Sequence, residues 1–408
     1  MNKARSRGLC SWAGVLLRWW PKKPRKASTG EGSRPNTTTP RPATCLCSIV
    51  ELMTLHPCHR LVFTFIAVSI ALWLPAGALA TSAPYPGDFW DEPSPASTGW
   101  SAVKLQAADE VARSIGTDAY LVVHRGVVVH KSGEVTKPMN LASVRKSVLS
   151  VLYGIEVDRN RIDLNKTLAG LGIDDRGGLS EAEKTATVRQ LLEARSGIYH
   201  PAAYETAGMK TDRPYRGSHK PGAYWYYNNW DFNALGTIFA KFTGTDVFAS
   251  LDKELARPLG FQDFSLSRDT EYVSELSSTH PAYVMRLSAR DLARVGLLMA
   301  RGGRWQDRQI VSTRWLAEST TSYSDVSPGL GYGYLWWVGR DNWAFGQRFP
   351  GAVFSARGNF GQFVLVDPSR DLVIVHRVDM GRLFKREVTG ARFGDLLAKI
   401  LAAAPSGF

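Results

Sequence analysis

Apolar and polar residues follow two different periods along this chain. Runs of β-branched and aromatic residues predict strands, and a pair of such runs around Arg125-Gly126 predicts a hairpin. The predicted strands cover 119–131, 334–338, 363–366 and 372–376. Segments with apolar residues three and four positions apart predict helices. These helices cover 100–115, 143–153, 187–193, 229–243, 247–255, 288–299 and 392–403.

The order of these elements predicts the fold class. Strands come early and late in the chain, and residues 155–284 are mainly helices and long loops. Strands gathered apart from helices are typical of an α+β domain. We therefore predict a mostly antiparallel sheet flanked by helices, built from residues before about 153 and after about 285, with a helical insertion at about 155–284.

The first 80 residues differ in composition from the rest. Residues 1–52 form a basic, low-complexity leader, and an apolar run at 61–74 is followed by Ala78-x-Ala80. A basic start, a short apolar core and a small-residue end are typical of a signal peptide. We predict a signal peptide at 53–80, translation from Met53, and one mature domain at 81–408 that is periplasmic or secreted. Contact with a membrane is expected only if this segment stays uncleaved.

Charge and cysteine content narrow the function classes. Residues 1–80 hold 11 of the 50 Lys and Arg and 2 of the 37 Asp and Glu, so the remainder carries only +4 of the formal +13. This excess is too small to favour nucleic acid as a partner. All four cysteines also precede residue 81. The sequence offers no His-Glu-x-x-His and no phosphate-binding loop, so neither a metal nor a cofactor is predicted.

The strongest chemical signal is Ser143-Val-Arg-Lys146. Ser143 precedes an apolar periodicity, so it lies near a helix start, and Lys146 lies one turn later on the same side. A desolvated lysine with a lowered pKa can activate a serine hydroxyl. A second Ser-x-x-Lys, Ser250 to Lys253, stands in an ordinary amphipathic segment, so the pattern alone does not identify the nucleophile.

Two further stretches could complete a site. The aromatic loop 221–230 offers a Tyr-x-Asn pair in two possible frames, Tyr226 with Asn228 or Tyr227 with Asn229. A phenol can relay a proton and an amide can hold a substrate, although such loops also serve as core packing.

The other stretch is Arg357-Gly358-Asn359, which leads into an apolar strand. Its edge N–H groups could contribute to an oxyanion hole, and the planar fork of Arg357 could bind a carboxylate. A glycine-bearing hairpin turn is the alternative interpretation.

The order of the three stretches resembles that of β-lactamases and penicillin-binding proteins. More specifically, residues 115–400 resemble the class C β-lactamase-related serine hydrolases, in the branch of esterases and 6-aminohexanoate-dimer hydrolase. The similarity includes Leu191-Leu192 with Ser196-Gly197, Pro221-Gly222, 288–293, and Gly361-Gln362 before Asp367-Pro368.

This resemblance implies roles for particular residues. It makes Ser143 the nucleophile, Lys146 the activating base, Tyr227 the acid/base partner and Asn229 a substrate or network contact. It excludes Ser250 as the nucleophile and favours Tyr227 with Asn229 over Tyr226 with Asn228. The N–H of Asn359 is the predicted second oxyanion donor beside that of Ser143, next to Gly358.

The third stretch departs from the family pattern, because Ala356-Arg357-Gly358 stands where penicillin-recognising members carry Lys-Thr-Gly or Lys-Ser-Gly. Lys131-Ser132-Gly133 precedes the nucleophile and cannot replace it. We therefore predict an ester or amide hydrolase acting on a small or peptide-like substrate. The alternatives are DD-peptidase or β-lactamase activity, or a non-catalytic muropeptide-binding module. The sequence predicts no oligomeric state.

Overall fold

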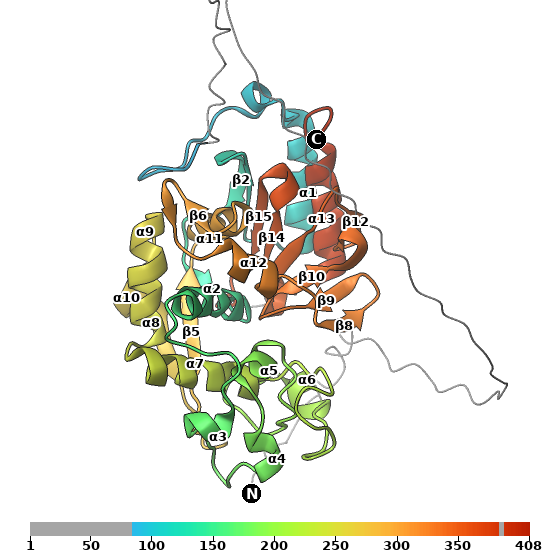
Figure 1. Cartoon of the computed structure of the whole chain (residues 1–408). Helices are drawn as coiled ribbons and strands as arrows, with labels where there is room; N and C mark the ends of the chain where they lie inside the picture. The colour runs from blue at the N-terminus through green and yellow to red at the C-terminus, as the bar shows by residue number, and fades with distance from the viewer. Residues whose placement is uncertain (1–83, 383–386) are drawn as a thin grey trace, which may run out of the picture. The chain divides into compact units, whose positions relative to one another are not determined.

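Eight antiparallel strands form the central sheet of the computed structural model, in the order β2-β1-β15-β14-β13-β10-β9-β8 (Figure 1). The structure describes residues 84–382 and 387–408. The predicted leader 1–52 and signal peptide 53–80 lie outside the described residues. The strands are β1 (Ala119–His124), β2 (Val127–Gly133), β8 (Ser324–Ser327), β9 (Leu330–Tyr332), β10 (Trp337–Gly339), β13 (Phe354–Gly358), β14 (Gln362–Asp367) and β15 (Leu372–Arg377).

Helices cover both faces of this sheet, so its middle strands are buried on both sides. All six residues of β14 and of β15 are buried. Alternate residues point to opposite faces. Val364 and Val375 share a hydrophobic cluster with α2 (Val144–Asp158) and α11 (Ala289–Ala300). Phe363 and Ile374 share another with α1 (Ala102–Ile115) and α13 (Gly390–Ala402). The predicted α+β fold is confirmed.

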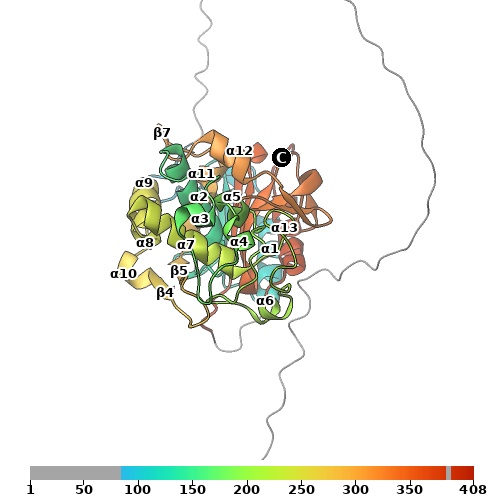
Figure 2. The same ribbon diagram turned by 60° about the horizontal axis from the view of Figure 1, so that its bottom comes forward.

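The helical segment lies on the α2 side and contains mostly short helices (Figures 1 and 2). Its longest helix is α7 (Asn229–Thr243). The others are α3 (Leu168–Leu171), α4 (Glu181–Lys184), α5 (Val188–Leu192), α6 (Ala207–Thr211), α8 (Val247–Ser250), a π-helical stretch (Leu251–Ala256), α9 (Arg257–Leu259) and α10 (Leu266–Asp269).

The insertion is less purely helical than the sequence suggested. Helix α2 continues to Asp158, and β4 (Thr270–Val273) and β5 (Ala282–Leu287) form a small sheet with β3 (Met139–Asn140). Five of the six residues of β5 are buried, so this strand lacks the alternation of polar and apolar residues that usually reveals a strand.

The predicted strand at 334–338 is shorter in the structure. Only Trp337 and Val338 belong to β10, because the N–H of Gly333 donates to the carbonyl of Trp336 at 2.9 Å and Leu335 has a positive φ of 64°. A tight turn therefore replaces the first half of the strand. The remaining elements are α12 (Thr313–Ser319), β6 (Arg304–Trp305), β7 (Arg308–Gln309), β11 (Trp343–Ala344) and β12 (Gln347–Arg348).

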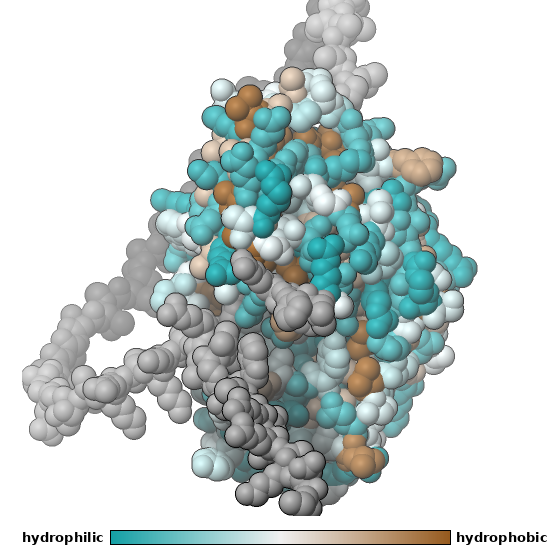
Figure 3. Space-filling model, turned by 180° about the vertical axis from the view of Figure 1, so that it is seen from behind, coloured by the Kyte–Doolittle hydropathy of each residue, from teal (hydrophilic) through white to brown (hydrophobic). Residues whose placement is uncertain are grey.

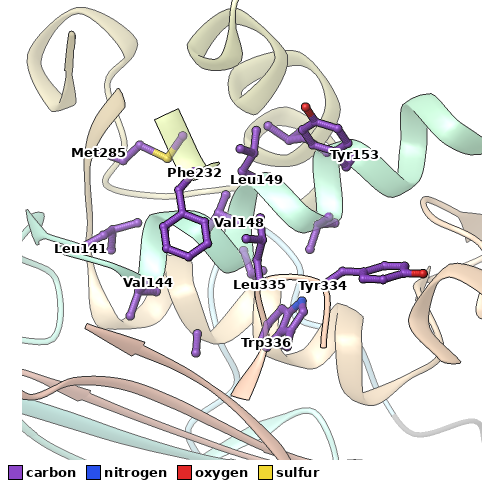
Figure 4. Packing of buried hydrophobic residues seen from close by; sticks show 14 of the residues in the cluster. Leu141, Val144, Val148, Leu149, Tyr153, Phe232, Met285, Tyr334, Leu335 and Trp336 are labelled. Carbon is purple, nitrogen blue, oxygen red and sulfur yellow. The ribbon is translucent and has the colours of Figure 1, made fainter. Parts of the chain in front are cut away.

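Helix α2 lies between the sheet and the helical segment and is buried on every side (Figure 4). All residues from Val144 to Glu156 are buried. Val144 and Val148 meet residues of the sheet side, and Leu149 lies toward Phe232 and Met285 of the helical side (Figure 4). Because no face of this helix reaches solvent, its polar residues are also enclosed, including Lys146.

The uncovered surface seen from behind is predominantly hydrophilic, with scattered hydrophobic residues (Figure 3). Within residues 84–382 and 387–408, no helix has the length and apolar content needed to cross a membrane.

Candidate active site

Ser143 lies at the N-cap position of α2, with φ −81° and ψ −7°. Its side chain makes no capping hydrogen bond, so the hydroxyl remains free for other partners. The preceding Ala142 has a positive φ of 45°, and its N–H donates to Asn140 Oδ1 at 2.8 Å. This tight turn delivers the hydroxyl at the beginning of a buried helix.

Lys146 contacts the other two predicted catalytic side chains and one predicted binding residue. Its Nζ lies 3.0 Å from Ser143 Oγ, 2.9 Å from Tyr227 Oη and 2.9 Å from Asn229 Oδ1. The lysine is only 1% exposed. The structure therefore brings Ser143, Lys146, Tyr227 and Asn229 into one hydrogen-bonded cluster.

The surroundings of Lys146 favour its neutral form. Burial lowers the pKa of Lys146 well below its ordinary value, and the neighbouring charge of Arg145 lowers it further. The rings of Tyr227 and Phe232 each lie 4.2 Å from Nζ. In the described part of the chain, no carboxylate forms an ion pair with Lys146. A neutral amine has a lone pair that can accept the proton of a serine hydroxyl.

The surroundings of Tyr227 favour its protonated form. Burial raises its pKa to about 12, although a hydrogen bond to Ser143 and the charge of Arg145 act against that shift. The phenol therefore keeps its proton at neutral pH and can donate it. Their environments thus lower the pKa of Lys146, the candidate base, and raise that of Tyr227, the candidate acid.

Asn229 has a fixed orientation at the first residue of α7. Its Nδ2 group donates to the carbonyl of Ala203 at 3.4 Å and also to that of Tyr204. The acceptor end of the amide must then face Lys146.

The alternative Tyr-x-Asn frame has a structural role in this fold. Tyr226 Oη donates to the carbonyl of Met209 at 2.6 Å. Asn228 caps α7, where its Oδ1 accepts from the N–H of Asp231 at 2.9 Å. Neither side chain has a hydrogen bond to Lys146 among the described residues.

The second Ser-x-x-Lys also lacks the geometry for catalysis. Ser250 ends α8 and is buried, whereas the Lys253 side chain is 73% exposed and lies 3.7 Å from Glu254. No hydrogen bond joins Ser250 to Lys253 in the described ranges. Lys131 of the early Lys-Ser-Gly pairs with Glu92 and belongs to β2, at the sheet edge farthest from β8.

Gly358, the last residue of β13, lies against the start of α2. A Cβ atom at this position would come within 2.7 Å of the Leu141 carbonyl oxygen and 3.0 Å of the Ser143 nitrogen. Only glycine permits this approach, because both neighbours are backbone atoms. Asn359 follows and is exposed. The end of β13 thus stands beside the Ser143 N–H, where a second oxyanion donor would be needed.

Arg357 lies at the edge of this cluster. Its Nε donates to Ser355 Oγ at 2.9 Å, and its guanidinium lies 4.0 Å from the Phe345 ring and 5.6 Å from the Trp337 ring. The Trp337 ring is in turn 5.3 Å from that of Tyr227. Arg357 forms no ion pair with any described carboxylate, and burial lowers its pKa.

A cavity of about 500 Å³ opens beside Arg357. The turn 327–330 and the segment 341–346 supply its other walls. Ser143, Lys146, Tyr227 and Asn229 do not line it, so Arg357 faces a space next to the hydrogen-bonded cluster and not inside it.

Sequence reasoning missed two residues near the site. Arg145 was visible only as a residue inside Ser-x-x-Lys, and its burial depends on the tertiary enclosure of α2. Trp337 was assigned to a strand without a function.

Among the described residues, no group of three or more His, Cys, Asp or Glu side chains could hold a metal ion.

Comparison with known proteins identifies the family of this chain. The Beta-lactamase family profile matches residues 104–378, and the chain belongs to this family of serine hydrolases. One similar structure is named "Putative 6-aminohexanoate-dimer hydrolase from Bacillus anthracis". It is 18% identical, with 78% of this chain and 88% of that chain covered and a TM-score of 0.58.

Two other structures share the fold at similar distance. A family VIII carboxylesterase is 16% identical over 74% of this chain and 97% of its own, with a TM-score of 0.56. A penicillin-binding protein homologue from Caulobacter crescentus is 17% identical over 75% of this chain and 99% of its own, with a TM-score of 0.55. The predicted relationship to β-lactamase-related hydrolases is confirmed.

Proposed function

We propose that this protein is an exported serine hydrolase that cleaves an ester or amide bond through an acyl-enzyme on Ser143. The observation that carries the proposal is the position of Lys146 Nζ, 3.0 Å from Ser143 Oγ in an enclosed site without a counter-ion among the described residues. Family membership supports hydrolase chemistry in general.

In the acylation step, Ser143 Oγ attacks the carbonyl carbon of the substrate while its proton moves to Lys146 Nζ. The carbonyl oxygen becomes an oxyanion, for which the N–H groups of Ser143 and Asn359 are the proposed donors. Tyr227 gives its phenolic proton to the leaving alcohol or amine as the carbon–heteroatom bond breaks. The proton on Lys146 then returns to Tyr227 across their 2.9 Å hydrogen bond.

Deacylation repeats these proton transfers with water as the nucleophile. Lys146 accepts a proton from water, the hydroxide oxygen attacks the acyl carbon, and the proton returns to Ser143 Oγ as the ester bond breaks. The products are a carboxylic acid and the regenerated serine. Every proton is carried by a residue of the described cluster.

We further propose that the substrate carries a carboxylate close to the scissile bond. Arg357 supports this proposal because it lacks an anionic partner among the described residues, borders a cavity and contacts Trp337 beside Tyr227. A guanidinium can bind a carboxylate through two parallel N–H···O hydrogen bonds of its planar fork.

Penicillin-binding, DD-peptidase or β-lactamase activity is the second candidate. The structural likeness to a penicillin-binding protein homologue favours it at the level of the fold. The absence of lysine at position 356 argues against it, since alanine stands there. Export is proposed from residues 53–80, and N-terminal sequencing of the native protein would test cleavage near Thr81.

Turnover of three substrate classes by the full chain tests the proposal. A neutral p-nitrophenyl ester, a linear amide and a penicillin would be compared, each beside Ser143→Ala. We expect ester or amide turnover that the substitution abolishes. Penicillin turnover alone would favour the second candidate. A stable covalent adduct that is not hydrolysed would indicate a binding module.

A further inference from the structure

Arg145 is a buried cation that precedes Lys146 in the sequence of α2. The residue is 1% exposed, and its Nη1 donates to the carbonyl of Ala142 at 2.9 Å. Its Nε and Nη2 atoms have no hydrogen-bond partner among the described residues. The guanidinium lies 5.2 Å from the ring of Tyr204 and 5.2 Å from that of Tyr283.

A buried guanidinium and a buried amine on adjacent residues would repel each other if both were charged. Neither Arg145 nor Lys146 has an ion pair in the described ranges. Burial of an uncompensated charge is costly, and an arginine side chain does not lose its proton in proteins. The conflict is therefore resolved at Lys146, whose amine can become neutral.

Other charged groups near this pair do not offset the arginine. Arg286 on β5 pairs with Glu271, and Glu205 pairs with Arg213. Glu275 accepts a hydrogen bond from the N–H of Tyr204 and is exposed. The other titratable groups around the pair include Tyr204, Tyr227, Tyr283 and Arg357, with Asp231 in the first turn of α7.

These remaining groups carry no negative charge that could stabilise a lysine cation. Burial raises the pKa of Tyr227 to about 12 and that of Tyr283 above its ordinary value. Burial also raises the pKa of Asp231 to about 8, and this carboxyl faces Ser196. Arg357 adds a positive charge, not a negative one.

We propose that Arg145 is a positioning residue that keeps Lys146 in its neutral, basic form and fixes the turn before Ser143. Its charge opposes protonation of the neighbouring amine, and its hydrogen bond to Ala142 holds a residue with a positive φ of 45°. The tyrosine rings supply the cation with partial compensation through their π faces. This inference rests on the proposed role of Lys146 as the base.

The pH dependence of fluorophosphonate labelling tests this role in the full chain. In that reaction, Ser143 Oγ bonds to phosphorus, fluoride leaves, and Lys146 takes the serine proton. Labelling falls at pH values below the pKa of Lys146, because the protonated amine cannot act as a base. The acidic limb of the pH profile is the range in which the labelling rate rises with pH. Removal of the Arg145 charge raises the pKa of Lys146 and moves this limb to higher pH.

Arg145→Gln removes the charge and retains a donor for the Ala142 carbonyl. We expect its acidic limb to rise by about one pH unit or more, the size that one nearby charge produces, with the wild-type rate restored above the limb. Arg145→Met, which fills the space between the rings with an apolar chain, is expected to show the same shift if the glutamine variant does not fold.

Arg159→Gln is the matched control, since Arg159 follows the same helix at its exposed C-terminal end. It should leave the limb unchanged. A folded Arg145→Gln or Arg145→Met variant with an unmoved limb, or with an equal loss at every pH, would overturn the role of the charge. Absence of labelling in the wild-type protein would instead defeat the proposed function itself.

Discussion

Lys146 Nζ lies 2.9 Å from Asn229 Oδ1, and the other end of the Asn229 amide is held by the carbonyls of Ala203 and Tyr204. A neutral amine has two N–H donors and one lone pair. Donation to Asn229 and to Tyr227 uses both donors and leaves the lone pair directed to the remaining partner, Ser143. The orientation of one amide therefore sets the direction of proton transfer.

Substitution of Asn229 should change the pH dependence of the reaction. Asn229→Asp places a carboxylate opposite Lys146, and an opposite charge stabilises the protonated amine. The pKa of Lys146 then rises, so the acidic limb of kcat/KM moves to higher pH. A pH profile on a neutral ester would check this, and a limb that moves to lower pH would contradict it.

The neighbouring Asn228 supplies the matched control. It caps α7 and has no hydrogen bond to Lys146 among the described residues. Asn228→Ala should cost about 1 kcal/mol of unfolding free energy, as loss of a helix cap usually does, while the pH profile keeps its shape. Chemical denaturation and the same ester assay would separate the two asparagines.

Removal of the Tyr227 hydroxyl should slow the chemical step. Tyr227→Phe keeps the ring contacts with Phe232 and Trp337 but removes the proton donor. We expect kcat to fall by about 10²–10⁴-fold, the usual contribution of a positioned acid or base. Tyr226→Phe loses the hydrogen bond to the Met209 carbonyl and should retain activity. Equal effects of the two substitutions would refute the assignment.

Replacement of Gly358 should disturb the oxyanion site through sterics alone. Gly358→Ala introduces a Cβ 2.7 Å from the Leu141 carbonyl oxygen and 3.0 Å from the Ser143 nitrogen, so the strand end must shift. A misplaced oxyanion donor costs about 10²–10³-fold in kcat. A Cβ at Gly87 would meet no atom within 4 Å, so Gly87→Ala should leave kcat unchanged. Ester hydrolysis by both variants is the measurement.

Arg357 should affect substrate choice more than catalysis. Arg357→Met removes the guanidinium and leaves an unbranched chain between Phe345 and Trp337. We expect kcat/KM for an ester that carries a carboxylate to fall by about tenfold or more, the loss of one charge-assisted hydrogen bond, whereas a neutral ester is little affected. An unchanged ratio between the two esters would exclude Arg357 from carboxylate recognition.

The buried Asp231 should make stability depend on pH. Burial raises its folded-state pKa from 3.8 to about 8, so the folded protein binds a proton that the unfolded chain releases. Stability from this group is complete below about pH 4 and is lost as pH rises toward 8. The unfolding free energy of Asp231→Asn should therefore fall less steeply across this window, by on the order of 1 kcal/mol per pH unit. Urea denaturation at several pH values would check the difference.

Local patterns predicted the fold because its strand and helix signals are short-range. The strand runs of β14 and β15 and the periodicity of α7 are continuous in sequence. The Tyr227 frame needed a family resemblance, since Tyr226 and Tyr227 look equivalent without their partners.

The burial of α2 on all sides could not be predicted from the sequence. Periodicity predicted a buried stripe on α2, but the helical segment covers the opposite face as well, and this coverage encloses Arg145 and Lys146. The position of Arg357 also depends on Phe345 from a separate loop. Contacts between distant segments, not propensities, determine these charges.

Covalent labelling of Ser143 tests the central claim most directly. The full chain would be treated with a fluorophosphonate probe and examined by intact mass spectrometry and peptide mapping, beside Ser143→Ala, Lys146→Met and the control Lys253→Met. The account predicts one adduct on Ser143 in the wild type and the control, none in Ser143→Ala, and much slower labelling in Lys146→Met. An unlabelled wild-type chain, or labelling that is independent of Lys146, would contradict it.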